Sequence, residues 1–214
     1  MLIRGQTVEF EKSDQEQVEA LQKWWKENWL SLLGGLVLGL GGILGWQYYG
    51  DYSDAQAATA STRYESIKAM LASEQLDAAN AEIEALVAAH PKSPYVAQSQ
   101  LALAQAQADS GDWAAAEASL REVIDGQADV AIEGLAILRL ARALWAQDKS
   151  DQALTLLNEA PENGYGPLYS DLKGDIARAA GDAAAAREAY QAALASNADF
   201  IDNNTVQQKL DALN

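Results

Sequence analysis

The stretch from residue 29 to residue 49 constrains this chain most, because it reads WLSLLGGLVLGLGGILGWQYY and contains no charged residue. At a helical rise of about 1.5 Å per residue it spans about 30 Å, the thickness of the hydrocarbon core of a bilayer. Aromatic residues lie at both of its ends, as is typical of membrane interfaces. No other part of the chain is apolar enough to cover this helix on every side. The stretch therefore predicts a transmembrane helix, and the alternative of a buried core helix is disfavoured.

The segment before the span, residues 1–28, divides into two parts. Residues 1–12 are polar and show no periodicity, which predicts disorder. Ser13 and Glu16 have the spacing of a capping box, which indicates the start of a helix. The apolar residues that follow share one helical face, and they are Val18, Leu21, Trp25 and Trp29. We expect a short amphipathic helix that lies at the interface and leads into the span, and a solvated linker helix is the alternative.

The charges around the span predict its orientation. Lys23 and Lys26 precede it closely, whereas only Arg63 follows within about 16 residues, so the N-terminus is expected in the cytoplasm. A cleaved signal peptide is the competing interpretation, because Ala55-Gln56-Ala57 resembles a cleavage site. That site lies about ten residues beyond the apolar run, which is already long for a signal peptide. We therefore expect a retained anchor, and an intact mass that begins at Ala58 would contradict it.

Glycines form a ridge within the span. Gly35, Gly39 and Gly42 recur at helical spacing and share one face, and Gly41 and Gly45 form a second pair. Small residues allow a second helix to approach closely in lipid, where the hydrophobic effect does not drive association. The ridge formed by Gly35, Gly39 and Gly42 is thus a hypothetical site of helix packing. Simple tolerance of glycine by membrane helices is the alternative.

The remaining chain, residues 50–214, is alanine-rich, with apolar residues three or four positions apart, which predicts helices throughout. Four turns recur in phase, namely Glu74-Gln75-Leu76, Gly111-Asp112-Trp113, Asp148-Lys149-Ser150 and Gly181-Asp182-Ala183. Each precedes a small residue, in the series Ala79, Ala116, Ala153 and Ala186, and then a larger one, in the series Ile83, Leu120, Leu157 and Tyr190. The first helices carry a small residue at Ala104, Ala141 and Gly174, while Ile67 departs from this pattern.

This pattern resembles the tetratricopeptide repeat over about residues 60–196. A small residue is needed where two helices of a hairpin cross closely, and a larger one fills the layer between hairpins. Such an array must cover its ends, so we expect Phe200 and Ile201, with the amphipathic tail that contains Val206, Leu210 and Leu213, to cover the last repeat. Gly50 and the surrounding residues 48–54 are expected to form a hinge between the span and the repeats.

The sequence offers no catalytic, cofactor or metal site. There is no cysteine and one histidine, His90, which precedes a proline at a predicted helix end. No glycine-rich phosphate loop occurs outside the apolar span. The chain has a net charge of −16, and residues 1–49 carry four basic and six acidic groups, so residues 50–214 carry −14. This charge argues against nucleic-acid binding, and nothing points to a small-molecule substrate.

A repeat array instead offers a concave groove in which exposed aromatic residues bind segments of other proteins. The candidates are Trp113, Trp145, Tyr165 and Tyr169, together with Tyr95. For each of them a place in the core is the alternative. The segment Pro161–Pro167 is the one loop of the domain that is rich in glycine and proline, and we expect it to project.

The whole chain after residue 14 resembles the YfgM family of ancillary SecYEG translocon subunits. The resemblance rests on EQVEALQKWWKENW, on the glycine-rich span ending in GWQYY, on AILRLARAL at residues 136–144, and on GDIARAAGDAAAAREAYQAAL at residues 174–194 with the tail QQKLDALN. It implies a bacterial inner-membrane protein with a periplasmic repeat domain. It also implies contact with the SecYEG translocon and with a PpiD-type periplasmic chaperone, no catalytic residues, and a role in handing over secreted proteins.

We therefore predict an all-α protein with three parts: a cytoplasmic segment at residues 1–28, a transmembrane helix at 29–49, and a periplasmic tetratricopeptide-like solenoid with a C-terminal capping helix at 50–214. The predicted function is a non-enzymatic, membrane-anchored interaction module at the translocon. A repeat scaffold for envelope or division complexes, without translocon contact, is the alternative. An enzyme built on the repeats is the third and least favoured interpretation.

Overall fold

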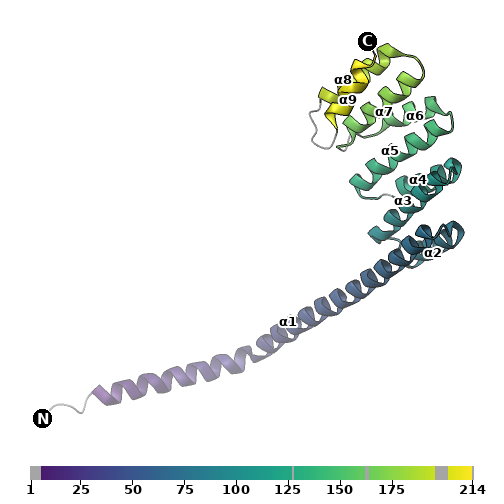
Figure 1. Cartoon of the computed structure of the whole chain (residues 1–214). Helices are drawn as coiled ribbons and strands as arrows, with labels where there is room; N and C mark the ends of the chain where they lie inside the picture. Colours follow the sequence, from purple (N-terminus) through teal and green to yellow (C-terminus); the bar gives the residue numbers. More distant parts are fainter. Residues whose placement is uncertain (1–5, 127, 162–163, 196–201, 214) are drawn as a thin grey trace. The chain divides into compact units, whose positions relative to one another are not determined.

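A computed structural model describes residues 6–126, 128–161, 164–195 and 202–213, and every regular element in these ranges is an α-helix (Figure 1). The chain forms two compact units, Met1–Ala55 and Gln56–Asn214. The helices are α1 (Gln6–Ala72), α2 (Leu76–Ala89), α3 (Pro94–Asp109), α4 (Trp113–Asp125), α5 (Val130–Ala146), α6 (Ser150–Glu159), α7 (Gly166–Ala179), α8 (Ala183–Ala195) and α9 (Asn203–Asp211).

Helix α1 corrects three expectations about the N-terminal region. It is already helical from Gln6, so residues 6–12 are not disordered, and residues 1–5 lie outside the described part of the chain. The helix passes through Ser13 without a start there, and through Gly50 without a hinge. The physical reason is that residues 6–28 contain neither glycine nor proline, and that one glycine costs a helix only about 1 kcal/mol. The capping-box spacing therefore occurs inside a helix here.

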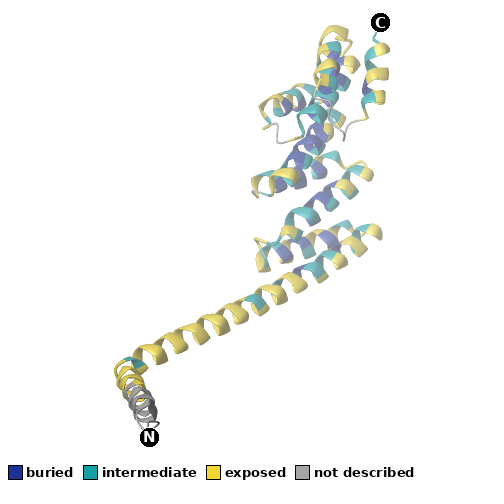
Figure 2. Ribbon diagram, turned by 90° about the vertical axis from the view of Figure 1, so that its left-hand side faces the viewer, coloured by how far each residue is buried: buried dark blue, intermediate teal, exposed yellow. Residues whose placement is uncertain are grey.

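The apolar part of α1 is the one helix, among the residues that the structure describes, that is long and apolar enough to cross a membrane. None of its apolar window is buried, and Figure 2 shows exposed residues along most of the helix. Leu38 and Trp46 are 79% and 82% exposed, which no core helix of a soluble protein would show. This exposure contradicts the alternative of a buried core helix and is what a candidate membrane span requires.

The four predicted repeat turns share one backbone geometry. Glu74, Gly111, Asp148 and Gly181 have φ angles of 58°, 83°, 61° and 81°, in the left-handed region. The next residue in each turn donates its backbone N–H to a carbonyl five residues earlier, at 2.9–3.0 Å, as in a Schellman motif. Asp112 and Asp182 also cap the following helix by accepting from the N–H of Ala115 and Ala185. The repeats are therefore in the phase that the sequence predicts.

Replacing Glu74 by glycine is expected to stabilise the repeat domain by about 0.5–1 kcal/mol, because a side chain with Cβ is strained at positive φ and glycine is not. Asp148→Gly should give a smaller gain, since aspartate tolerates this conformation better. Gly111→Ala is the matched control and should destabilise. Urea unfolding of the full chain in detergent micelles, followed by far-UV circular dichroism, measures all three. An unfolding midpoint of Glu74→Gly below that of the wild type would contradict the geometry.

The small and large positions of the repeats pack as predicted. The alanines at the small position, where the two helices of each hairpin cross, are fully buried: Ala79, Ala116, Ala153 and Ala186. The four larger residues are at most 3% exposed, and they are Ile83, Leu120, Leu157 and Tyr190. The core is made of three hydrophobic clusters: one joins the end of α1 with α2 and α3, the largest joins α3 to α7, and the third joins α7, α8 and α9.

Helix α9 covers the last hairpin. Val206 is buried in the third cluster, and Leu210 and Leu213 pack against it. Lys209 donates to the carboxylates of Asp171 and Asp175 on α7, each at 2.8 Å. Burial alone would lower the pKa of Lys209, but these two hydrogen bonds outweigh it and raise the pKa. Phe200 and Ile201, which we also expect to cover this end, lie outside the described residues.

Candidate functional site

Helices α3, α4 and α5 enclose a groove with a volume of about 350 Å³. Trp113 and Leu135 supply its large apolar surfaces, and Ala104 and Ala108 line it from α3. Arg139 and Arg142, from two successive turns of α5, supply its charge. We call this cavity the arginine groove. It combines an aromatic ring, small residues and two guanidinium groups, which suits the binding of another chain better than chemistry.

Trp113 is held in the arginine groove from two sides. Asp112, the N-cap of α4, fixes the first turn in which Trp113 lies. Gln147, at the end of α5, donates to the backbone carbonyl of Trp113 at 3.2 Å. The side chain of Trp113 is only partly buried against the largest cluster, so part of the ring remains accessible. Trp113 lines this cavity, and its role in binding another chain stays a proposal.

Arg139 and Arg142 give the groove its electrostatic character. Arg139 is partly buried and donates to the backbone carbonyl of Leu101 at 3.4 Å, whereas Arg142 is exposed. Burial, followed by the charge of Arg142, lowers the pKa of Arg139 from its usual value. Among the residues that the structure describes, no carboxylate lies within ion-pair distance of either guanidinium. Asp109 also lines the groove, beyond ion-pair distance, so the positive charge of the two arginines is offset only in part within the fold.

Tyr169 is not a groove residue, which corrects the sequence-based prediction. Its side chain is 2% exposed and its hydroxyl donates to the carbonyl of Gly134 at 3.1 Å. Burial, followed by the nearby Tyr165, raises the pKa of Tyr169 to about 12. The prediction failed because an aromatic residue at helical spacing gives the same sequence pattern whether its side chain faces the core or a groove.

The other aromatic candidates do not line the arginine groove. The ring of Tyr165 stacks on that of Tyr169 at a centroid distance of 6.1 Å and covers Gly134, where an added Cβ would lie 2.4 Å from the Tyr165 ring. Trp145 packs, partly buried, on the largest cluster. Tyr95 stacks on Tyr64, with 5.4 Å between the ring centroids. Of the predicted aromatic residues, Trp113 alone lines the groove, although Tyr165 lies near enough to Arg139 to interact with its charge.

The predicted projecting loop is shorter than expected. Gly166 and Pro167 form the first turn of α7, where proline is favoured because its missing N–H is not needed. Glu162 and Asn163, the centre of the loop, lie outside the described residues.

The glycine ridge of α1 is open along its length. An added Cβ at Gly35, Gly39 or Gly42 would meet no atom of this chain within 4 Å. Their neighbours in the span, such as Leu36, Val37 and Leu38, are exposed. Nothing in the described part of the chain therefore requires glycine at these positions, and the ridge stays a hypothetical site for a second helix.

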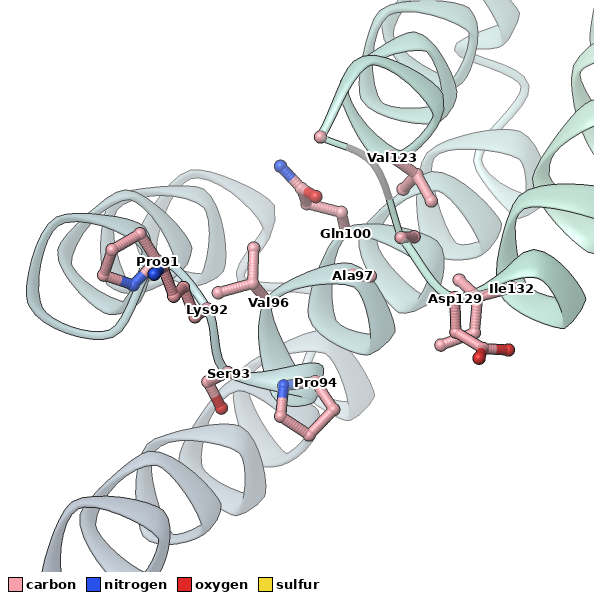
Figure 3. Close-up of a pocket in the computed structure, with 12 residues that line it drawn as sticks. Pro91, Lys92, Ser93, Pro94, Val96, Ala97, Gln100, Val123, Asp129 and Ile132 are labelled. Atoms are coloured by element: carbon pink, nitrogen blue, oxygen red, sulfur yellow. The ribbon is translucent and has the colours of Figure 1, made fainter. Parts of the chain in front are cut away.

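A second cavity, of about 420 Å³, lies where α2, α3, α4 and α5 are connected (Figure 3). Figure 3 shows Pro91 and Lys92 on one side of it and Asp129 and Ile132 on the other. Its polar groups mostly act in the fold: Ser93 caps α3, Asp129 caps α5, and Gln100 donates to Glu122. This cavity is therefore a weaker candidate than the arginine groove.

The described residues contain no group of three or more histidine, cysteine or acidic side chains that could hold a metal ion. His90 lies at the C-cap of α2, as predicted from the proline that follows it. Neither cavity contains a side chain arranged as a nucleophile with a base.

Sequence reasoning missed Arg139 and Arg142 because it searched for aromatic residues. A signal was present in AILRLARAL, an apolar stretch of α5 that carries two basic residues three positions apart, while the one acidic residue of this helix, Glu133, lies in its first turn. Residues with this spacing share one helical face. A basic pair within an apolar stretch of a helix was therefore a second signal for a binding site, beside the aromatic residues.

Comparison with known proteins identifies close counterparts over nearly the whole chain. Residues 22–214 match the family model described as a tetratricopeptide repeat-like domain. The chain is 30% identical to the ancillary SecYEG translocon subunit of Haemophilus influenzae, over 94% of this chain and 97% of the relative. It is 28% identical to that of Escherichia coli, over 96% and 99%, and 30% identical to that of Neisseria gonorrhoeae, over 94% and 97%. No solved structure gives a significant match.

Proposed function

Because the chain belongs to the tetratricopeptide repeat-like family of ancillary SecYEG translocon subunits, we propose that it is a membrane-anchored, non-enzymatic module that helps to pass secreted proteins from the translocon to a periplasmic chaperone of the PpiD type. The observation that carries this proposal is the family match over residues 22–214, which includes the whole apolar span as well as the repeats. The family is a class of translocon accessory subunits and not a class of enzymes.

In this proposal α1 holds the chain in the inner membrane, with its N-terminus in the cytoplasm and the repeats in the periplasm. The two lysines before the span and the single arginine after it support this orientation. The charge of −14 on residues 50–214 does not oppose translocation, because long domains cross largely regardless of their charge. The arginine groove then faces the compartment in which an emerging chain or a chaperone is available.

Crosslinking followed by copurification from detergent-solubilised membranes tests this function. We expect the tagged full chain to bring down SecYEG subunits and a PpiD-type chaperone. A scaffold for envelope or division complexes would instead bring down other membrane proteins and neither of these. Recovery of the chain without translocon subunits would overturn the proposal in favour of that alternative.

Replacing the span by a polyleucine helix is expected to keep the protein in the membrane but to reduce copurification of translocon subunits. Leucine covers the ridge of Gly35, Gly39 and Gly42, so a second helix can no longer approach closely. Losing a contact of about 1–2 kcal/mol corresponds to a reduction of about fivefold to thirtyfold. Quantitative immunoblotting of the copurified translocon measures the effect.

A matched pair of variants separates the ridge from the rest of the span. Gly35, Gly39 and Gly42 are replaced by leucine in one variant, and Gly34, Gly41 and Gly45 in the other. We expect only the first to reduce copurification, because the ridge is the proposed contact; a loss confined to the second would overturn this in favour of the Gly41 and Gly45 pair. Equal copurification of both variants with the wild type would show that the span is a tether.

A further inference from the structure

The two arginines of the arginine groove are set apart by sharing one cavity without an ion pair: Lys92 and Lys173 also pair with no carboxylate in the described part of the chain, but neither lines this groove. Arg63 pairs with Glu82, Arg121 and Lys149 pair with Glu117, and Lys209 pairs with two aspartates. Arg139 and Arg142 pair with no carboxylate in the described part of the chain, although acidic residues outnumber basic ones by 14 over residues 50–214. Two adjacent guanidinium groups without an ion pair are thus available to a negative charge from outside the chain.

The surroundings of these arginines limit the occupant. Trp113 and Leu135 present apolar surface in the same groove, so part of the ligand must be apolar. Asp109 also lines the groove, where it accepts a hydrogen bond from Gln105 at 2.8 Å. With two arginines and one aspartate the groove has a net charge of +1, which suits one carboxylate and disfavours a polyanion.

We propose that the arginine groove binds a segment of a partner polypeptide in which an acidic side chain lies beside an apolar one. A guanidinium donates two parallel hydrogen bonds to a carboxylate, and the apolar neighbour packs against Trp113. The inference rests on the proposed function, because it names the chemistry of the chain that the groove receives.

The charge of the whole molecule argues for this occupant over others. Nucleic acid and an anionic lipid surface carry many charges, and residues 50–214 repel them. A second copy of this chain also carries −16 and is repelled at long range. A segment whose only charge is one acidic side chain meets little repulsion from the acidic domain before it reaches the two arginines. Burial beside a second cation, which lowers the pKa of Arg139, is relieved when a carboxylate neutralises the pair.

Binding of defined peptides to the full chain in detergent micelles tests the inference. The probe is a short fluorescent peptide of leucine, alanine and serine, capped at both ends, with one internal glutamate beside a leucine. We expect it to bind about tenfold more tightly than the same peptide with glutamine, since hydrogen bonds to charged groups contribute about 1.5–3 kcal/mol. Fluorescence anisotropy measures both affinities. Equal affinities would overturn the inference.

The variants locate the binding. Arg139→Gln/Arg142→Gln should bind both peptides alike, whereas Lys92→Gln/Lys173→Gln changes the net charge equally and should keep the preference for glutamate. Arg142→Lys retains the charge without the planar fork and should keep only part of that preference. Far-UV circular dichroism confirms that the variants are folded. A retained preference in the double-arginine variant would contradict the inference.

Two further arms separate this inference from its neighbours. The first arm is a glutamine peptide with a free C-terminal carboxylate: if this peptide binds and the capped glutamate peptide does not, the occupant is a chain terminus and the inference is wrong. The second arm is analytical ultracentrifugation: if the double-arginine variant alters the oligomeric state, the occupant is a second copy of this chain and the inference is wrong. Copurification of SecYEG with the wild type is measured in parallel. If the wild-type chain copurifies with SecYEG but binds the glutamate and glutamine peptides equally, only the inference is overturned. If the wild-type chain does not copurify with SecYEG, the proposed function is overturned.

Discussion

Replacing Gly174 by alanine is expected to lower the free energy of unfolding of the repeat domain by about 2–3 kcal/mol, the cost of overpacking a dense core. An added Cβ at Gly174 would lie 2.4 Å from Cε1 and 2.5 Å from Cδ1 of the Tyr190 ring. That ring has no room to move, because Tyr190 is fully buried and its hydroxyl donates to Asp175 at 2.8 Å. Urea unfolding of the full chain in detergent micelles measures the change.

Two comparisons show whether the contact with Tyr190 causes this loss. Gly134→Ala creates a similar overlap with Tyr165, but Tyr165 is partly exposed at the start of α7 and can turn away, so its cost should be smaller. In a Tyr190→Leu background Gly174→Ala should become neutral or stabilising, since alanine favours a helix by about 1 kcal/mol. If Gly174→Ala leaves the free energy of unfolding unchanged in the wild-type background, α7 and α8 must pack less closely than in this structure.

Replacing Glu117 by glutamine is expected to cost about 2 kcal/mol at neutral pH and progressively less as the solution is acidified. Lys149, at the N-cap of α6, and Arg121, one turn further along α4, donate to its carboxylate, each at 2.8 Å. Gln147, at the end of α5, donates to it at 2.9 Å, so Lys149 and Gln147 hold α4 to the next two helices. The hydrogen bond from Lys149, followed by that from Arg121, lowers the pKa of Glu117 from 4.5 to about 2. A pKa shift corresponds to about 1.4 kcal/mol per unit. The expected cost is smaller than this conversion gives, because both cations are partly exposed and solvent screens their charges.

The pH dependence identifies the carboxylate as the source of this stability. A folded pKa below the unfolded pKa gives stability that is complete above pH 4.5 and is lost as the pH falls toward 2. The difference between wild type and Glu117→Gln should thus be constant from pH 7 to about pH 5.5 and should fall to about half by pH 3. Glu188→Gln, at an exposed site of α8, is the control and should give little difference at any of these pH values. A difference that does not change with pH would contradict the ion-pair origin.

The repeats could be predicted in detail because their signals are local. The turn residues, the small residue five positions after the start of each turn and the larger one four positions later recur at fixed offsets in the sequence, and all of them appear in the structure in the predicted places. Even the two departures, Glu74 and Asp148, adopt the backbone conformation of the glycines that they replace. Local errors arose where one pattern fits two structures, as at Ser13 and Gly50, where the helix simply continues.

The candidate site could be predicted only in part. Trp113 was identifiable from its type and position, but Tyr169 was indistinguishable from it until its burial was known. The two arginines were visible in AILRLARAL, yet no local pattern shows that they lack acidic partners. That depends on which carboxylates of other helices come within reach, as Glu117 does for Lys149 across 32 positions.

By itself the sequence determined the membrane-spanning helix, the all-α class and the phase of the four hairpins, because each of these follows from hydrophobicity and turn chemistry within a short window. The tertiary structure alone decided which side chains of those helices meet. It placed Trp113 of α4 beside Arg139 and Arg142 of α5, and it closed Tyr190 over Gly174. The physical reason is that burial and ion pairing depend on distances between helices far apart in sequence, whereas helix formation depends on neighbours along the chain.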